Sequence, residues 1–154
     1  RLLTEQDGFP RRLHGIINEL KQKHTMDFVN RFCSPNFTHQ YALSNLSKDG
    51  YRLAVGSNSI APSISTMLQK ANLLQFLEFF VSADDVNKGK PSPEIYNFAV
   101  SRLGLMPQEC LIIEDNPNGI KAAKASGAHL MEVIEVEDVS YWNIKTRIQD
   151  IEAS

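Results

Sequence analysis

The sequence predicts an α/β protein in which helices cover both faces of a Rossmann-like parallel sheet. From residue 41 onward, segments with apolar residues at helical spacing alternate with short apolar runs, and the loops between them are short. This alternation is typical of a parallel sheet with helical crossovers. Three of the predicted strands also lead into polar or charged residues. Such residues suit a ligand site, because open parallel sheets bind ligands at the carboxyl ends of their strands.

The first forty residues have a different character, since they predict helix and loop without strands. The segment 9–23 and the shorter segment 26–32 both have helical patterns. The apolar positions on one face of the first helix are Leu13, Ile16, Ile17 and Leu20. No candidate catalytic residue stands out in this region.

The remainder of the chain predicts four strands and five helices. Helix 41–50 ends at Gly50, where positive φ costs little, and helix 92–104 begins on Ser92 with Pro93 at its first position. The final helix has Ile144, Ile148 and Ile151 at helical spacing. The predicted strands are 51–59, 79–82, 110–115 and 129–134. The predicted helices are 41–50, 60–73, 92–104, 116–127 and 139–154.

Composition narrows the class of protein. A chain of 154 residues with 42% hydrophobic and 22% charged residues is typical of one globular domain. The net charge of −2 supplies no broad cationic surface, which argues against nucleic acid as the main partner. No apolar run approaches the roughly 18 residues that span a bilayer, so we expect a soluble, cytoplasmic protein without a membrane partner. The two cysteines, Cys33 and Cys110, lack metal-ligand spacing and are expected to be free thiols.

The first candidate site residues are Ser57 and Asn58, in the small polar turn at the end of the strand segment 51–59. The Ser57 hydroxyl and the backbone amides of Asn58 and Ser59 suit a phosphoryl oxygen, because helix N-termini present free N–H groups to anions. The alternative interpretation is an ordinary N-cap, since Ser and Asn are common there. This segment alone does not decide between the two.

The second candidate is Lys90, which lies between Gly89 and Pro91 in a stiff loop just before a helix. A lysine on a surface loop is usually only solvated. An ammonium held by rigid flanks beside a strand end can instead neutralise charge on a phosphate and on an attacking carboxylate. The position of this loop in the predicted sheet favours the second interpretation.

The third candidate is the pair Glu114 and Asp115, which directly follows the apolar residues 111–113. Two neighbouring carboxylates without a counterion resist ionisation, and a hard cation such as Mg²⁺ relieves that repulsion. Strand alternation would let one carboxylate bind the metal directly and the other through a water. The alternative is that Asp115 caps the next helix and that Glu114 is merely exposed.

Three segments together resemble motifs of the haloacid dehalogenase superfamily, in the branch that includes β-phosphoglucomutase and small sugar-phosphate or nucleotide phosphatases. They are "LAVGSNS", "GKPSPEIY" and "LIIEDNPNGIKAAKASGA", in that order within residues 41–135. The resemblance implies that Ser57, with the Asn58 backbone beside it, hydrogen-bonds the transferring phosphoryl group. It further implies that Lys90 bridges the phosphate and the nucleophile. Glu114 and Asp115 would then hold Mg²⁺.

This superfamily places its nucleophile on an earlier strand, in an Asp-x-Asp motif whose first carboxylate attacks phosphorus and whose second acts as general acid and base. The 154 residues contain no Asp-x-Asp motif. We therefore expect residues 1–40 to be the end of an α-helical cap and residues 41–154 to be the α/β core without its first strand.

The resemblance implies a Mg²⁺-dependent hydrolase, a phosphatase that acts on a small phosphorylated metabolite through an aspartyl phosphate. Its nucleophile would lie outside this sequence, so we expect the 154 residues alone to be inactive. Two alternatives stay open: a phosphomutase of the same superfamily, and a non-catalytic domain that binds a phosphorylated ligand or a partner chain. A dinucleotide-binding domain fits poorly, because no G-x-G-x-x-G follows a strand.

Overall fold

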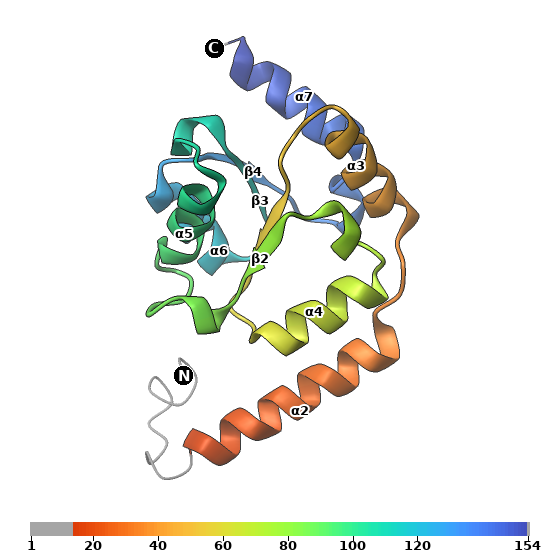
Figure 1. The fold of residues 1–154 in the computed structure, drawn as a ribbon, viewed down its shortest axis with the longest axis vertical. Helices are drawn as coiled ribbons and strands as arrows, with labels where there is room; N and C mark the ends of the chain where they lie inside the picture. Colours follow the sequence, from red (N-terminus) through yellow and green to blue (C-terminus); the bar gives the residue numbers. More distant parts are fainter. Residues whose placement is uncertain (1–13, 154) are drawn as a thin grey trace.

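The computed structural model describes residues 14–153 and has the predicted alternation of helices and parallel strands (Figure 1). The helices are α2 (His14–Phe32), α3 (Phe37–Lys48), α4 (Ala61–Lys70), α5 (Glu94–Leu103), α6 (Pro117–Ser126) and α7 (Tyr141–Glu152). The strands are β1 (Ala54–Gly56), β2 (Phe79–Val81), β3 (Leu111–Glu114) and β4 (His129–Glu132). The predicted α/β class is therefore confirmed.

The four strands form two separate parallel pairs, which differs from the single sheet that the sequence predicts. In one pair Val55 of β1 lies opposite Phe80 of β2, and in the other Ile112 of β3 lies opposite Leu130 of β4. Within residues 14–153 no strand joins β1 to β3. Both edges of each two-stranded pair lack a further hydrogen-bonded strand in this part of the chain, so the strands do not form one continuous sheet.

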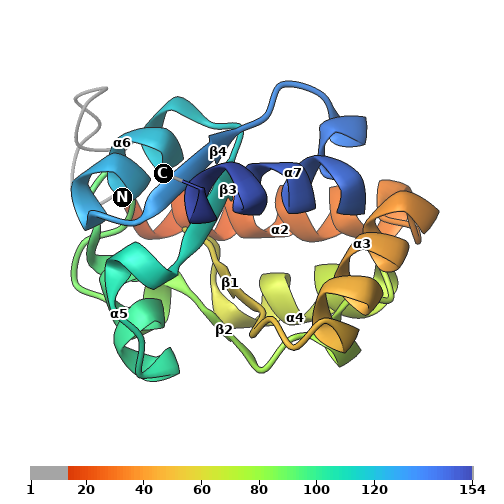
Figure 2. The same cartoon turned by 90° about the horizontal axis from the view of Figure 1, so that it is seen from above.

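Helices on both faces hold the two strand pairs together. Figure 1 shows α5 and α6 on one side of the strands and α3, α4 and α7 on the other, and Figure 2 shows the same layers from above. On the α5–α6 side, Val81 of β2 and Ile112 of β3 belong to one apolar cluster. On the α3–α7 side, Leu53 and Leu111 pack against a second cluster that contains Ile144 of α7. Each face therefore has a core that contacts both strand pairs.

Local residues determine where α5 and α6 begin and end. Helix α6 begins after Asn116, whose side chain accepts a hydrogen bond from the N–H of Asn118 at 2.9 Å. Helix α5 begins at Glu94 with Pro93 as its N-cap, one residue later than predicted. Gly104 and Gly127 end α5 and α6 at φ values of 67° and 80°, in the left-handed region that favours glycine.

The long helix α2 departs most from the prediction. The two short helical segments form one continuous helix of 19 residues, and the predicted position Leu13 lies outside the described residues. Ile16 and Leu20, predicted on an apolar face, are each 56% exposed. Helix α2 lies along α4, and Val29 is its one residue in the buried core of the described chain (Figure 1). None of the helices in residues 14–153 has the length and apolar character needed to cross a bilayer.

The core predicts a clear difference between two isoleucines. Ile64 of α4 is fully buried, whereas Ile134 is 88% exposed. We expect Ile64→Ala to lower the free energy of unfolding by about 2–5 kcal/mol, because it removes apolar contacts and leaves a cavity. Ile134→Ala, the matched control, should change it by less than about 0.5 kcal/mol. Urea unfolding measures both, and equal effects of the two substitutions would contradict this packing.

Candidate functional site

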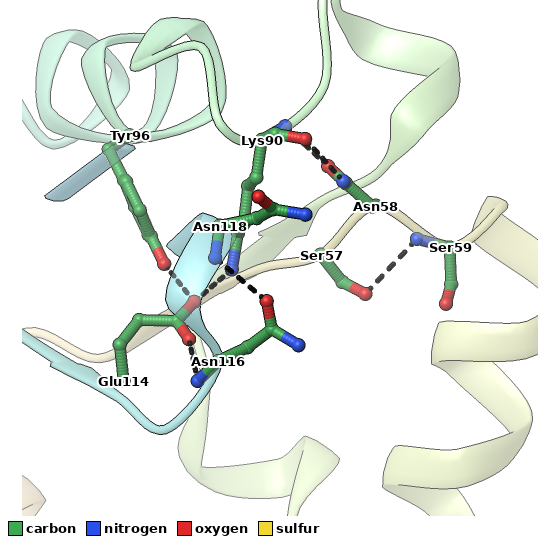
Figure 3. A network of polar contacts seen from close by, with 8 residues as sticks. All are labelled: Ser57, Asn58, Ser59, Lys90, Tyr96, Glu114, Asn116 and Asn118. Carbon is green, nitrogen blue, oxygen red and sulfur yellow. Dashed lines mark hydrogen bonds and ion pairs between the residues drawn. The ribbon is translucent and has the colours of Figure 1, made fainter. Parts of the chain in front are cut away.

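The candidate site lies where β1, the loop after β2 and β3 come together (Figure 3). Asn58, just after β1, holds the backbone of Lys90 from both sides: its Oδ1 accepts from the Lys90 N–H at 2.7 Å, and its Nδ2 donates to the Lys90 carbonyl at 3.0 Å. A Cβ added to Gly89 would lie 2.6 Å from this Oδ1, so the close approach requires glycine. The predicted rigid setting of Lys90 thus comes chiefly from the Asn58 side chain.

Lys90 and Glu114 form an ion pair in this site. The Lys90 ammonium donates to Oε1 of Glu114, and the two side chains are only 13% and 8% exposed. The ammonium also lies over the Tyr96 ring, 4.7 Å from its centroid. The pair is largely removed from water. Removing one of the two charges would therefore destabilise the protein far more than breaking an ion pair on the surface.

Tyr96 of α5 is the third member of this group. It is 8% exposed, and its hydroxyl donates to the same Glu114 oxygen that Lys90 contacts (Figure 3). Burial raises the pKa of Glu114, but hydrogen bonds from Lys90 and Tyr96 and the charge of Lys90 outweigh it and hold that pKa below its ordinary value. Burial, assisted by the carboxylates of Glu114 and Asp115, raises the pKa of Tyr96, which therefore stays protonated as a donor.

The second oxygen of Glu114 faces the start of α6. Oε2 accepts a hydrogen bond from the N–H of Asn116 at 3.3 Å. Gly119 lies against the same carboxylate, and a Cβ at Gly119 would overlap it. The helix can therefore approach Glu114 this closely only with glycine at that position. Both carboxylate oxygens are engaged, so the predicted alternative in which Glu114 is merely exposed is wrong.

Ser57 lies at the other side of the site. Its N–H donates to the carbonyl of Val81 at 2.9 Å, and its Oγ accepts from the N–H of Ser59 at 3.2 Å. The hydroxyl hydrogen remains for another acceptor. The N-cap position of α4 is Ile60, and Asp84 accepts from the Ala61 N–H at 3.0 Å. Neither Ser57 nor Asn58 is the N-cap of α4, contrary to the alternative interpretation.

Asp115 has an exposed carboxylate next to the buried Glu114. The following helix is capped by Asn116, so the alternative role of Asp115 as its cap is also wrong. Among residues 14–153 there is no cluster of three or more His, Cys, Asp or Glu side chains that could hold a metal ion. The carboxylate donors in this site are Asp115, which is exposed to solvent, and Glu114, whose charge is already matched by Lys90.

The fold and the site together define a parallel α/β core with a hydroxyl, an ammonium and two carboxylates at the carboxyl ends of its strands. The profile of the family described as haloacid dehalogenase-like hydrolase matches residues 3–133. The chain belongs to this family, which confirms the resemblance seen in the sequence.

Similar proteins include several phosphatases. Hexitol phosphatase A of Escherichia coli is 37% identical over 91 residues, which are 59% of this chain and 42% of that protein. Phosphoglycolate phosphatase of Salmonella choleraesuis is 34% identical over 55% of this chain and 34% of its own length. The chain thus spans less than half the length of either relative.

The fold also matches solved structures. The structure of β-phosphoglucomutase from Clostridium difficile superposes with a TM-score of 0.71 at 17% sequence identity. The match covers 89% of this chain and 66% of that one. At this level of identity the likeness shows a common fold.

Three residues that shape the site, namely Tyr96, Asn116 and Gly119, were not among the predicted site residues. Tyr96 follows Ile95 in the predicted helix, and a tyrosine on a buried face needs a hydrogen-bond partner, which was a usable signal. Asn116 directly precedes Pro117, which is a common arrangement at the start of a helix. The need for glycine at position 119 depends on the position of Glu114, and no local pattern reveals it.

The contact between Gly119 and Glu114 predicts opposite effects for two helical glycines. Gly119→Ala should lower the free energy of unfolding by about 1–3 kcal/mol, because the added methyl group overlaps the Glu114 carboxylate. Gly15 of α2 has open space around it, so Gly15→Ala should be neutral or stabilise by up to about 1 kcal/mol. Urea unfolding compares the two, and a Gly119→Ala protein as stable as the Gly15→Ala control would show that this close approach is absent.

Proposed function

We propose that this chain is the core part of a Mg²⁺-dependent phosphatase that acts on a small phosphorylated metabolite. The observation that carries the proposal is the convergence of Ser57 after β1, Lys90 in the loop between β2 and α5, and Glu114 at the end of β3 (Figure 3). A hydroxyl donor and a fixed ammonium beside carboxylates are the groups that phosphoryl transfer requires, since that reaction depends mainly on positioning and charge neutralisation.

Each site residue has a proposed role in this reaction. Ser57 Oγ–H and the Asn58 backbone N–H would donate to the phosphoryl oxygens. Lys90 would neutralise charge between the phosphate and the attacking carboxylate. That carboxylate, an aspartate that forms the covalent intermediate, lies outside these 154 residues in our proposal, so the chain alone would not turn over substrate.

The two carboxylates fit Mg²⁺ unequally. Mg²⁺ takes one or two protein carboxylates, keeps several waters and accepts phosphate oxygens. Asp115 is the exposed donor and would bind the ion directly, whereas Glu114, held by Lys90 and Tyr96, would contact it through a water. When bound, Mg²⁺ supplies positive charge that stabilises the transferring phosphoryl group.

The similar proteins support a phosphatase and a small phosphorylated substrate. Two of them are named for the hydrolysis of hexitol phosphate and phosphoglycolate. In our proposal residues 1–40 belong to a helical cap and residues 41–154 to the core. The position of α2, which lies along α4 outside the strand layers, supports its assignment to the cap, whereas α3 (Phe37–Lys48) runs across residues 40 and 41 (Figure 1).

Magnesium binding tests the metal assignment. Asp115→Asn should weaken the affinity of the chain for Mg²⁺ at least tenfold, because it removes the exposed negative ligand. The matched control is Asp27→Asn, an exposed carboxylate on α2 that should leave the affinity unchanged. Isothermal titration with MgCl₂ gives both values. Equal affinities for the two variants would contradict a metal site at Asp115.

A second measurement separates the phosphatase from a binding domain. We expect Mg²⁺-dependent turnover of p-nitrophenyl phosphate by the polypeptide that carries these residues together with an Asp-x-Asp strand. Binding of inorganic phosphate without turnover in that polypeptide would instead support a domain that only binds a phosphorylated ligand.

A further inference from the structure

A row of aromatic side chains crosses the junction between α3 and α7. The two helices pack against each other, and each supplies two of the rings (Figure 1). Successive ring centroids along the row lie 6.1, 6.1 and 5.1 Å apart, which are distances of favourable aromatic contact. The rings of this aromatic row, in order, are those of Phe37, Tyr41, Tyr141 and Trp142.

Most of the aromatic row is open to solvent. Phe37 is 79% exposed, Trp142 is 69% exposed and Tyr41 is 44% exposed. The Tyr141 hydroxyl donates to Asp49 at 2.8 Å, so the polar end of that ring is already bonded within the chain. Single apolar side chains on a surface are ordinary, but a contiguous group of them marks an interaction site.

Two exposed aliphatic side chains adjoin the aromatic row. They are Ile134 and Val136, in the segment between β4 and α7. Nε2 of His39 donates to the Val136 carbonyl at 3.0 Å, which holds this segment against the first turn of α3, where the row begins. The carboxylates of Glu135 and Glu137 in the same segment are exposed, so they can stay in water at the rim of an interface.

We propose that the aromatic row binds a second copy of this chain across a two-fold axis. A two-fold interface brings the same surface of both molecules together, so a row without charged side chains can pair with itself without like-charge repulsion. The net charge of −2 also keeps the repulsion between two whole molecules small. With the axis at the centre of the row, Phe37 of each molecule would lie against Trp142 of the other.

The exposed area of this surface fits a weak dimer. At about 200 Å² for each aromatic side chain, the three exposed rings offer roughly 400 Å² in one molecule. Two facing rows, together with Ile134 and Val136 of both molecules, would bury about 1,000 Å² in total, which is near the lower limit for a specific interface. Interfaces of this size are weak, so we expect a dissociation constant on the order of 10 μM.

Trp142 reports on this surface directly, because it is the single tryptophan of the chain. The measurements use buffer without Mg²⁺ and phosphate, so they are independent of the proposed function. Between about 1 and 200 μM protein, sedimentation velocity should show the change from monomer to dimer. Over the same range the Trp142 emission should shift to shorter wavelength. Its quenching by acrylamide should become at least about twofold weaker, because the indole leaves water in the dimer.

Substitutions on both helices locate the interface. Trp142→Glu should raise the dissociation constant at least about tenfold, since it places a carboxylate against an aromatic ring of the other molecule. Position 142 is in the first turn of α7, where an acidic side chain suits the helix dipole, so this variant should fold. Phe37→Glu, in the first turn of α3, should weaken the dimer to the same degree.

The matched control lies on another exposed aromatic surface. Phe28 of α2 is exposed and contacts the Phe32 ring, with the two ring centroids 4.8 Å apart. Phe28→Glu should therefore change the dissociation constant by less than about twofold, because α2 is outside the proposed interface. Circular dichroism of all three variants shows that any loss of dimer does not result from unfolding.

Four results would overturn the proposal. The first is a protein that stays monomeric up to about 200 μM, well above the expected dissociation constant. The second is a dimer that forms without any change in Trp142 quenching, which would place the interface elsewhere. The third is a dimer that folded Trp142→Glu and Phe37→Glu variants still form with unchanged affinity. The fourth is an equal or greater effect of Phe28→Glu, which would assign the interface to α2.

Discussion

The ion pair between Lys90 and Glu114 joins the two halves of the strand layer at the candidate site. Asn58, at the end of β1, fixes the Lys90 backbone, and the Lys90 ammonium reaches Glu114 at the end of β3. Burying two charges costs hydration free energy, which is recovered only when the geometry is good and the remaining polar atoms are bonded. Tyr96 and the Asn116 N–H supply those additional bonds to Glu114. The residues that form the candidate site are therefore also the residues that connect the two strand pairs.

Helices hold the strand layer together where backbone hydrogen bonds do not. The cluster around Val81 and Ile112 contacts both strand pairs on one face, and the cluster around Leu46 and Ile144 does so on the other. Apolar burial is non-directional, so it can hold two sheets side by side without a shared ladder. In residues 14–153 no strand pairs with the edges of β1 and β3 that face away from β2 and β4, and the cavity between these strands is lined at one end by Glu114 and Asp115.

Much of the fold could be predicted from the sequence, because the apolar spacing and the helix-ending residues in each segment agree with the elements that the structure shows. The glycine at the end of α5, the glycine at the end of α6 and the apolar run of β3 all lie where the pattern predicts. The division into two strand pairs could not be predicted, since it depends on whether a strand lies between β1 and β3. The site residues were found from polar groups that follow apolar strands. Their partners were not, because the contact of Tyr96 with Glu114 joins separate elements and has no signature in either segment.

A double-mutant cycle on unfolding tests most directly whether the buried ion pair joins the two halves. Urea unfolding of the original chain, Lys90→Met, Glu114→Gln and the double variant gives the coupling free energy between the two side chains. Our account predicts a favourable coupling of about 1–3 kcal/mol, with each single variant less stable because it leaves a largely buried charge without its partner. Additivity within about 0.5 kcal/mol would contradict it, since independent effects would mean that the pair does not join the strand pairs.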